Sequence, residues 1–187
     1  MRKRRKHCYK TYLAGPMQAV AHSGAGWRVV LGRILSKRFG MEVQDPVQGE
    51  RKKTRRSATG TKNLLKTLTS LLVRGDKDAE RKFLKLLRKV IELDFKAIRA
   101  SRFIVALVIE GIVSSGTNEE IIYASKKKIP VYILYLGRIE NFPAWMLYRI
   151  LRSGGRVFPV KDVKKPRDFN DLIEYLKRRF ELEKLEW

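Results

Sequence analysis

Two adjacent glutamates, Glu119 and Glu120, follow a run of apolar residues and a loop of small residues. The apolar run is 103–109, "FIVALVI", and the loop ends in the Ser-Ser-Gly of 114–116. A carboxylate just beyond the end of a buried strand is well placed to act as a nucleophile. The small residues also leave backbone N–H groups free for an anionic oxygen, such as that of a phosphate. The stretch is therefore a candidate active site.

The same residues also fit the start of a helix. Thr117 is a suitable N-cap, and Glu120 stands three residues later, which is the spacing of a capping box. Glu119 is then a surface residue favoured by the helix dipole. At this point a helix start and an active site both explain the two glutamates.

The elements that position this stretch alternate along the chain. Strands are expected where short apolar or alternating runs occur, at 9–15, 41–43, 103–109, 131–136 and 156–160. Helices are expected at 27–39, 63–73, 77–100, 117–128, 143–155 and 167–185. Asp76 is the expected cap of the longest helix, whose expected apolar face includes Leu84 and Ile91. Residues 47–62 are polar and basic, as expected of a loop.

This alternation predicts a three-layer αβα fold of the flavodoxin or Rossmann-like kind, with a five-stranded parallel sheet. Ligands of such folds bind outside the carboxyl ends of the strands, where the loops 15–26 and 110–116 are expected. We expect a basic tail at 1–8 and one α/β domain at 9–187, with a basic and helical insert at about 47–80.

Composition excludes several classes of protein. Hydrophobic residues make up 44% of the 187 residues, which indicates a globular chain, and the longest apolar run is too short to cross a bilayer. The single cysteine, Cys8, fits a reducing cytoplasm. With His7 and His22 it makes a poor ligand set for zinc, so we expect no metal and no other cofactor.

The chain is strongly basic, with 42 Lys and Arg against 19 Asp and Glu and a net charge of +23. The basic residues cluster at Arg2–Lys6, Arg51–Arg56 and Lys126–Lys128. Such a field attracts nucleotides or nucleic acid. Equally, the clusters fit solvated tails and loops that aid solubility.

Three blocks of sequence resemble the nucleoside 2-deoxyribosyltransferase family, which includes deoxynucleoside 5'-monophosphate N-glycosidases. The blocks are "TYLAGPM" at 11–17, "ELDFKAIRASRFIVALV" at 92–108 and "SSGTNEEIIYASKKKIPVYIL" at 114–134, in the family's order. The resemblance covers most of the chain but neither the insert at about 47–80 nor the basic tail.

The resemblance implies that Glu120, and not Glu119, is the nucleophile that attacks the anomeric carbon of deoxyribose. Covalent catalysis by a carboxylate suits an oxocarbenium-like centre. In the first turn of a helix, Glu120 is expected to be ionised at neutral pH. The resemblance also implies that Asp94 binds the substrate and helps protonate the departing base, and that Tyr12 hydrogen-bonds Glu120.

The resemblance further implies substrate contacts. Gly15 would let the backbone approach the sugar or phosphate, and Gly116 lies in the loop suited to a phosphate. Where the transferases have an aspartate, this chain has Ser114, which can donate to a phosphate that an aspartate would repel. The chain therefore favours deoxynucleotides over deoxynucleosides, although base exchange on nucleosides stays open. Base recognition is expected near Trp27, Arg28 and Asp45.

In this family a neighbouring subunit often completes the pocket, so a homodimer or higher homo-oligomer is expected. Residues 142–149 are its expected surface, although Trp145 and Met146 fit a core position equally well. Two alternatives to the enzyme remain. One is a nonspecific nucleic-acid-binding protein that uses the basic tail and the loop at 51–56, and the other is a nucleotide sensor without turnover.

Overall fold

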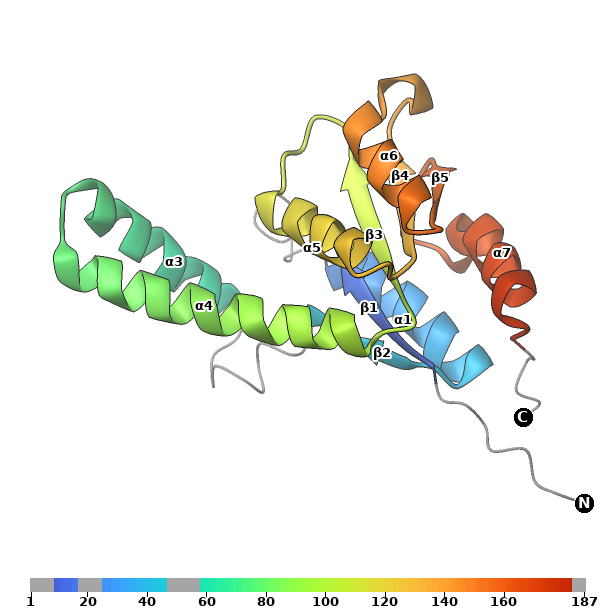
Figure 1. Cartoon of the computed structure of the whole chain (residues 1–187), viewed down its shortest axis with the longest axis horizontal. Coiled ribbons are helices and arrows are strands. Elements are labelled where there is room, and N and C mark those ends of the chain that lie inside the picture. The colour runs from blue at the N-terminus through green and yellow to red at the C-terminus, as the bar shows by residue number, and fades with distance from the viewer. Residues whose placement is uncertain (1–8, 17–24, 47–57, 183–187) are drawn as a thin grey trace, which may run out of the picture.

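The computed structural model describes residues 9–16, 25–46 and 58–182 and contains one parallel β-sheet. Its strands are β1 (Lys10–Ala14), β2 (Glu42–Gln44), β3 (Phe103–Ile109), β4 (Val131–Leu136) and β5 (Arg156–Val160). Their order across the sheet is β2-β1-β3-β4-β5, and every neighbouring pair is parallel (Figure 1). The predicted five-stranded parallel sheet is confirmed, and this strand order is that of flavodoxin-like folds.

Helices cover both faces of the sheet. The helices of the described residues are α1 (Ala25–Phe39), α3 (Ala58–Val73), α4 (Lys77–Ala100), α5 (Ser115–Lys126), α6 (Ala144–Arg152) and α7 (Asn170–Phe180). The core on one face is built with α1 and α7, and the core on the other face with α4, α5 and α6. This arrangement is the predicted three-layer fold.

The strands have unbroken runs of apolar residues because both of their faces are buried. Along β1, Leu13 packs on the side of α1 and α7, whereas Tyr12 packs on the side of α4 and α5. Along β3, Val105 likewise packs on the side of α1 and α7, and Ile104 on the side of α4 and α5. Because successive side chains of a strand point to opposite faces, a strand between two helical layers needs apolar residues at every position.

Helices α3 and α4 form a hairpin that extends well beyond the sheet (Figure 1), and we call this hairpin the arm. Asp76 caps α4 as predicted, because its carboxylate accepts hydrogen bonds from the backbone N–H groups of Asp78 and Ala79. Near its carboxyl end α4 packs on α5, where Phe95 stacks on Tyr123 with ring centroids 3.9 Å apart.

Three expectations about the elements are corrected. The predicted loop at 47–62 is wrong from Ala58 onward, where the backbone is already helical despite the weak helix propensity of the Ala-Thr-Gly-Thr stretch. The helix as a whole packs on α4, and such packing can outweigh local propensity. The last helix is preceded by a 3-10 turn, Pro166–Phe169, and ends before Glu181, which has a left-handed φ of 50°. Leu84 and Ile91, expected on the apolar face of α4, are exposed.

The basic tail at 1–8, the basic cluster at 51–56 and the end of the expected last helix at 183–185 lie outside the described residues. Among the helices that the structure describes, none combines the length and the apolar character needed to cross a membrane.

Candidate active site

The site lies where the direction of the chain across the sheet reverses. From β1 the chain continues to β2 on one side, whereas from β3 it continues to β4 on the other side. In folds of this kind the helices that follow two such strands leave a crevice between them at the carboxyl end of the sheet. Tyr12 of β1 and Glu120 of α5 lie at this point.

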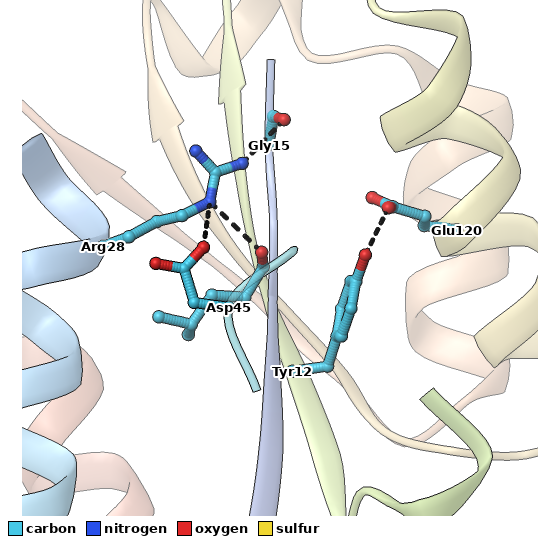
Figure 2. A network of polar contacts seen from close by, with 6 residues as sticks. Tyr12, Gly15, Arg28, Asp45 and Glu120 are labelled. Atoms are coloured by element: carbon cyan, nitrogen blue, oxygen red, sulfur yellow. Dashed lines mark hydrogen bonds and ion pairs between the residues drawn. The ribbon is translucent and has the colours of Figure 1, made fainter. Parts of the chain in front are cut away.

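Tyr12 and Glu120 are joined by a hydrogen bond. The Tyr12 hydroxyl donates to Oε1 of Glu120 over 2.6 Å, across 108 residues of sequence (Figure 2). The hydrogen bond expected between these two residues is therefore present. It fixes the direction in which the carboxyl group of Glu120 points.

Helix α5 begins earlier than the sequence predicts. Ser114 is its N-cap, with an extended backbone, and its Oγ lies 2.8 Å from Oγ1 of Thr117. Thr117 is therefore already inside the helix, and the predicted capping box between Thr117 and Glu120 is wrong. Glu120 belongs to the second turn, where the helix dipole favours a carboxylate less than in the first turn.

The surroundings of Glu120 raise the pKa of its carboxyl group. Burial raises the pKa of this carboxyl from 4.5 to about 8, although part of its surface stays accessible. The hydrogen bond from Tyr12 lowers this pKa, the charge of Asp94 raises it, and the charge of Arg28 lowers it. Burial therefore opposes the ionisation at neutral pH that the sequence predicts for Glu120, because the cost of burial exceeds the help of its neighbours.

Asp94 belongs to the same electrostatic environment. It lies half-buried on α4. The pKa of the Tyr12 hydroxyl is raised well above its ordinary value by burial first, and then by the charges of Glu120 and Asp94. Tyr12 therefore stays a neutral hydrogen-bond donor, and Asp94, Tyr12 and Glu120 influence one another electrostatically.

A buried arginine anchors the carboxyl end of β1. Arg28, on α1, is 1% exposed and donates from Nε to the carbonyl oxygen of Leu13 and from Nη2 to that of Gly15, at 3.3 and 2.8 Å (Figure 2). Its Nε lies 3.8 Å from Oδ1 of Asp45, beyond β2. Burial lowers the pKa of Arg28, and the charges of Asp45 and Glu120 raise it.

The positioning role of Arg28 is the part of this site that sequence reasoning missed. Arg28 was expected beside a base-recognition surface, whereas its guanidinium group faces the backbone of β1. The available signal was its place next to Trp27 in the first turns of α1, on the side of the helix that packs on the sheet. Buried charges in proteins are almost always paired and hydrogen-bonded, as this one is.

The side chains of Trp27 and Arg28 leave little room for a residue larger than glycine at position 15. A Cβ atom at this position would lie 3.0 Å from Cζ2 of Trp27 and 3.2 Å from Nη2 of Arg28. Trp27 is 3% exposed, and its indole Nε1 has no hydrogen-bond partner among the described residues. Contacts of Gly15, Trp27 and Asp45 with a substrate stay predictions.

The amino end of α5 is open by comparison. Ser115 and Gly116 are exposed, and a Cβ atom on Gly116 would meet none of the described atoms within 4 Å. The first backbone N–H groups of a helix have no partner within the helix, so this end can receive an anion. Within the part of the chain that the structure describes, no group of three or more His, Cys, Asp or Glu side chains could hold a metal ion.

Helix α6 presents apolar side chains to solvent. Trp145 is 79% exposed and Leu151 is 61% exposed, and Leu147 and Tyr148 are exposed beside them. Met146, in contrast, packs against the core built with α4, α5 and α6. Of the two positions for which the sequence left surface and core open, Trp145 lies on the surface and Met146 packs inward.

No protein-family model matches the chain, and no curated protein sequence matches it. Solved structures do match. A 2-deoxyribosyltransferase from Bacillus psychrosaccharolyticus is 16% identical, with a TM-score of 0.53, and the match covers 95% of this chain and 99% of that chain. A conserved protein from Enterococcus faecalis is 20% identical, with a TM-score of 0.55, and the match covers 91% and 98%.

A CMP N-glycosidase from Clostridium botulinum is 16% identical over 88% of this chain and 98% of that chain, with a TM-score of 0.48. The fold assignment rests on the first two structures. The chain therefore shares its fold with a 2-deoxyribosyltransferase, and the Tyr12–Glu120 pair lies at the carboxyl edge of that fold's sheet.

Proposed function

We propose that this protein is an enzyme of the nucleoside 2-deoxyribosyltransferase family, which cleaves or transfers the N-glycosidic bond of 2'-deoxyribonucleotides or 2'-deoxyribonucleosides. The observation that carries the proposal is the hydrogen bond between Tyr12 and Glu120. It joins two separate blocks of the family resemblance at the edge of the sheet where α/β folds bind ligands. The shared fold is consistent with this assignment.

In the first step, a carboxylate oxygen of Glu120 attacks the anomeric carbon of the deoxyribose. A carbon–oxygen ester bond forms, the bond from carbon to the base nitrogen breaks, and its electron pair leaves with the base. The base needs a proton to leave easily, and Asp94 is the group that we assign to help supply it. Tyr12 holds the attacking oxygen in position through its hydrogen bond.

In the second step, water or a second base attacks the same carbon. The ester bond breaks, its electron pair returns to Glu120, and the attacking group loses a proton. Water gives a free deoxyribose or its 5-phosphate, whereas a base gives a new nucleoside or nucleotide. Splitting the displacement into two steps lowers the barrier of each.

We assign deoxynucleoside 5'-monophosphates as the favoured substrates, with hydrolysis as the favoured outcome. Ser114 offers a hydroxyl where the transferases carry an aspartate, and the open amino end of α5 adds backbone donors. The net charge of +23 attracts charged nucleotides more than neutral nucleosides. Base exchange on unphosphorylated nucleosides is the second candidate.

A chromatographic assay separates these reactions. The substrates are a panel of deoxynucleosides and their 5'-monophosphates, each incubated with and without a free acceptor base. We expect free base and deoxyribose 5-phosphate from the wild type and none from Glu120→Ala. Glu119→Ala is the matched control, because it removes the adjacent carboxylate from the same turn, and it is expected to keep full activity.

Other outcomes correct the proposal at separate points. Base exchange on unphosphorylated nucleosides would make the protein a transferase and contradict the substrate assignment from Ser114. Full activity of Glu120→Ala would remove the proposed nucleophile. An absence of turnover on every substrate would overturn the enzymatic proposal.

A further inference from the structure

The solvent-facing side of α4 is strongly basic. The exposed charged residues of α4 comprise eight basic and two acidic side chains. The basic ones are Lys77, Arg81, Lys82, Lys85, Arg88, Lys89, Lys96 and Arg99, and the acidic ones are Asp78 and Glu92. At 3.6 residues per turn, all ten lie within an arc of about 140° around the helix. We call this surface the basic face of the arm.

Most of the basic side chains on this face form no ion pair with another described residue. Lys77 pairs with Glu80, and Arg81 pairs with Asp78. Among the described residues, the remaining lysines of the face and Arg88 take part in no ion pair. Positive side chains instead stand one turn apart, as Arg81, Lys85 and Lys89 do, where like charges on a helix repel one another. This repulsion is relieved when an anionic partner lies along the face.

We propose that the basic face of the arm binds the phosphate backbone of double-stranded nucleic acid. From Lys77 to Arg99 the face is about 33 Å long at 1.5 Å per residue. That length corresponds to about ten base pairs at 3.4 Å each. A straight, rigid row of cations of this length can follow phosphates without reading bases, and the binding is therefore nonspecific in sequence.

The chemistry of the face favours a duplex over the other polyanions. It contains no exposed aromatic side chain on which the bases of a single strand could stack. An anionic membrane would need an apolar face to insert, but the apolar side of α4 packs on α3, and the exposed apolar residues Leu84 and Ile91 lie just outside the basic arc. The basic arc itself thus carries charged side chains without apolar ones, which suits a phosphate backbone better than insertion into a lipid layer.

The arm leaves the sheet beside the candidate active site, because α4 carries both the basic face and Asp94. The sheet-side end of the same helix is held by the stacking of Phe95 on Tyr123. A duplex on the arm would therefore lie against one side of the molecule without covering the core. This inference concerns binding and does not depend on the proposed activity.

The test measures the binding of the full chain to a fluorescein-labelled 20-base-pair duplex by anisotropy, between 50 and 200 mM salt. The arm variant combines Lys85→Gln, Arg88→Gln and Lys89→Gln. The control variant combines Arg33→Gln, Lys37→Gln and Arg38→Gln, which removes the same charge from exposed positions of α1 on the opposite side of the sheet. Thermal melting establishes that both variants are folded.

We expect the arm variant to lose at least about tenfold in affinity, and its slope of log K against log salt to fall by about 2–3. The control variant is expected to change affinity by less than about twofold, and Glu120→Ala to bind as the wild type does. Equal losses in the arm and control variants would show a diffuse field and overturn the proposal. Arm-dependent binding of phosphatidylserine vesicles without binding of the duplex would overturn it as well.

Discussion

At the scale of single residues, Glu120 is subject to two opposed demands. A nucleophile must be ionised, yet burial raises the pKa of Glu120 to about 8 and favours the protonated form. Tyr12 and Arg28 lower this pKa and so oppose the effect of burial, the first through a hydrogen bond and the second through its charge. In the proposed mechanism these two residues set the pH at which the enzyme begins to work.

We therefore expect kcat/KM to rise with pH, with a midpoint near pH 8 and a plateau about one pH unit higher, where free Glu120 is ionised. Tyr12→Phe removes a hydrogen bond that stabilises the carboxylate, and the midpoint is expected to move up by about one pH unit. A pH series with a deoxynucleotide substrate measures both effects. A profile that falls through pH 8 would instead assign Glu120 as a general acid, because that role requires the proton.

The stability of the fold should depend on the same proton. The folded-state pKa of Glu120 is raised from 4.5 to about 8, so between these values the folded chain binds more protons than the unfolded chain. This contribution to stability is complete below pH 4.5 and is lost as pH rises through 8. Glu120→Gln, which has no charge to bury, is expected to be more stable than the wild type at pH 9, by roughly 1–3 kcal/mol.

Urea denaturation at pH 5, 7 and 9 measures this difference, with Glu119→Gln as the control for loss of an exposed carboxylate on the same helix. The advantage of Glu120→Gln should shrink as the pH falls to 5. An advantage that is the same at all three pH values would contradict the assigned pKa.

At the scale of elements, Gly15 and Gly116, both predicted to contact the substrate, have different structural surroundings. Gly15→Ala is expected to destabilise the protein by roughly 1–3 kcal/mol, because its Cβ would press on Trp27 and Arg28 and strain the packing of α1 on β1. Gly116→Ala is expected to leave stability unchanged or to raise it by up to about 1 kcal/mol, because its Cβ enters open space in the first turn of α5.

The same two variants separate packing from substrate contact. Thermal melts give the stability change, and the KM for a deoxynucleoside 5'-monophosphate reports on contact. We expect Gly116→Ala to raise this KM without loss of stability. An unchanged KM would remove Gly116 from the proposed phosphate contacts.

The sequence predicted the elements better than their ends. The fully apolar runs of β3 and β4 predicted a parallel sheet between two helical layers, and the cap at Asp76 predicted the start of α4. The start of α5 was predicted two residues too late, because Thr117 and Ser114 are both good caps and sequence alone does not decide between them.

The Tyr12–Glu120 contact was predictable through the family resemblance. The buried anchor of Arg28 was not, because it depends on how α1 packs against the backbone of β1. The pKa of Glu120 was missed for a related reason, since the helix dipole can be inferred from sequence but the burial of a side chain cannot.

At the scale of the whole molecule, the exposed apolar side chains of α6 form a candidate contact surface between subunits, in line with the homodimer expected from the resemblance. We predict that the wild type elutes as a dimer and that Trp145→Glu combined with Leu151→Glu elutes as a folded monomer, because a buried apolar contact cannot accept unpaired charges. Light scattering after size exclusion measures the mass. The variant Val73→Glu, at an exposed apolar position on the arm, is the matched control and should stay dimeric.

The position of β1 inside the sheet has a consequence for synthesis on the ribosome. β1 lies between β2 and β3, and its pairing with β3 must wait until the arm and β3 itself have been made. The hydrogen bond from Tyr12 to Glu120 forms later still, after α5 has been made. During translation the nascent chain therefore carries β1 with one edge unpaired while the whole arm is being produced, and the residues proposed to do chemistry meet only after that interval.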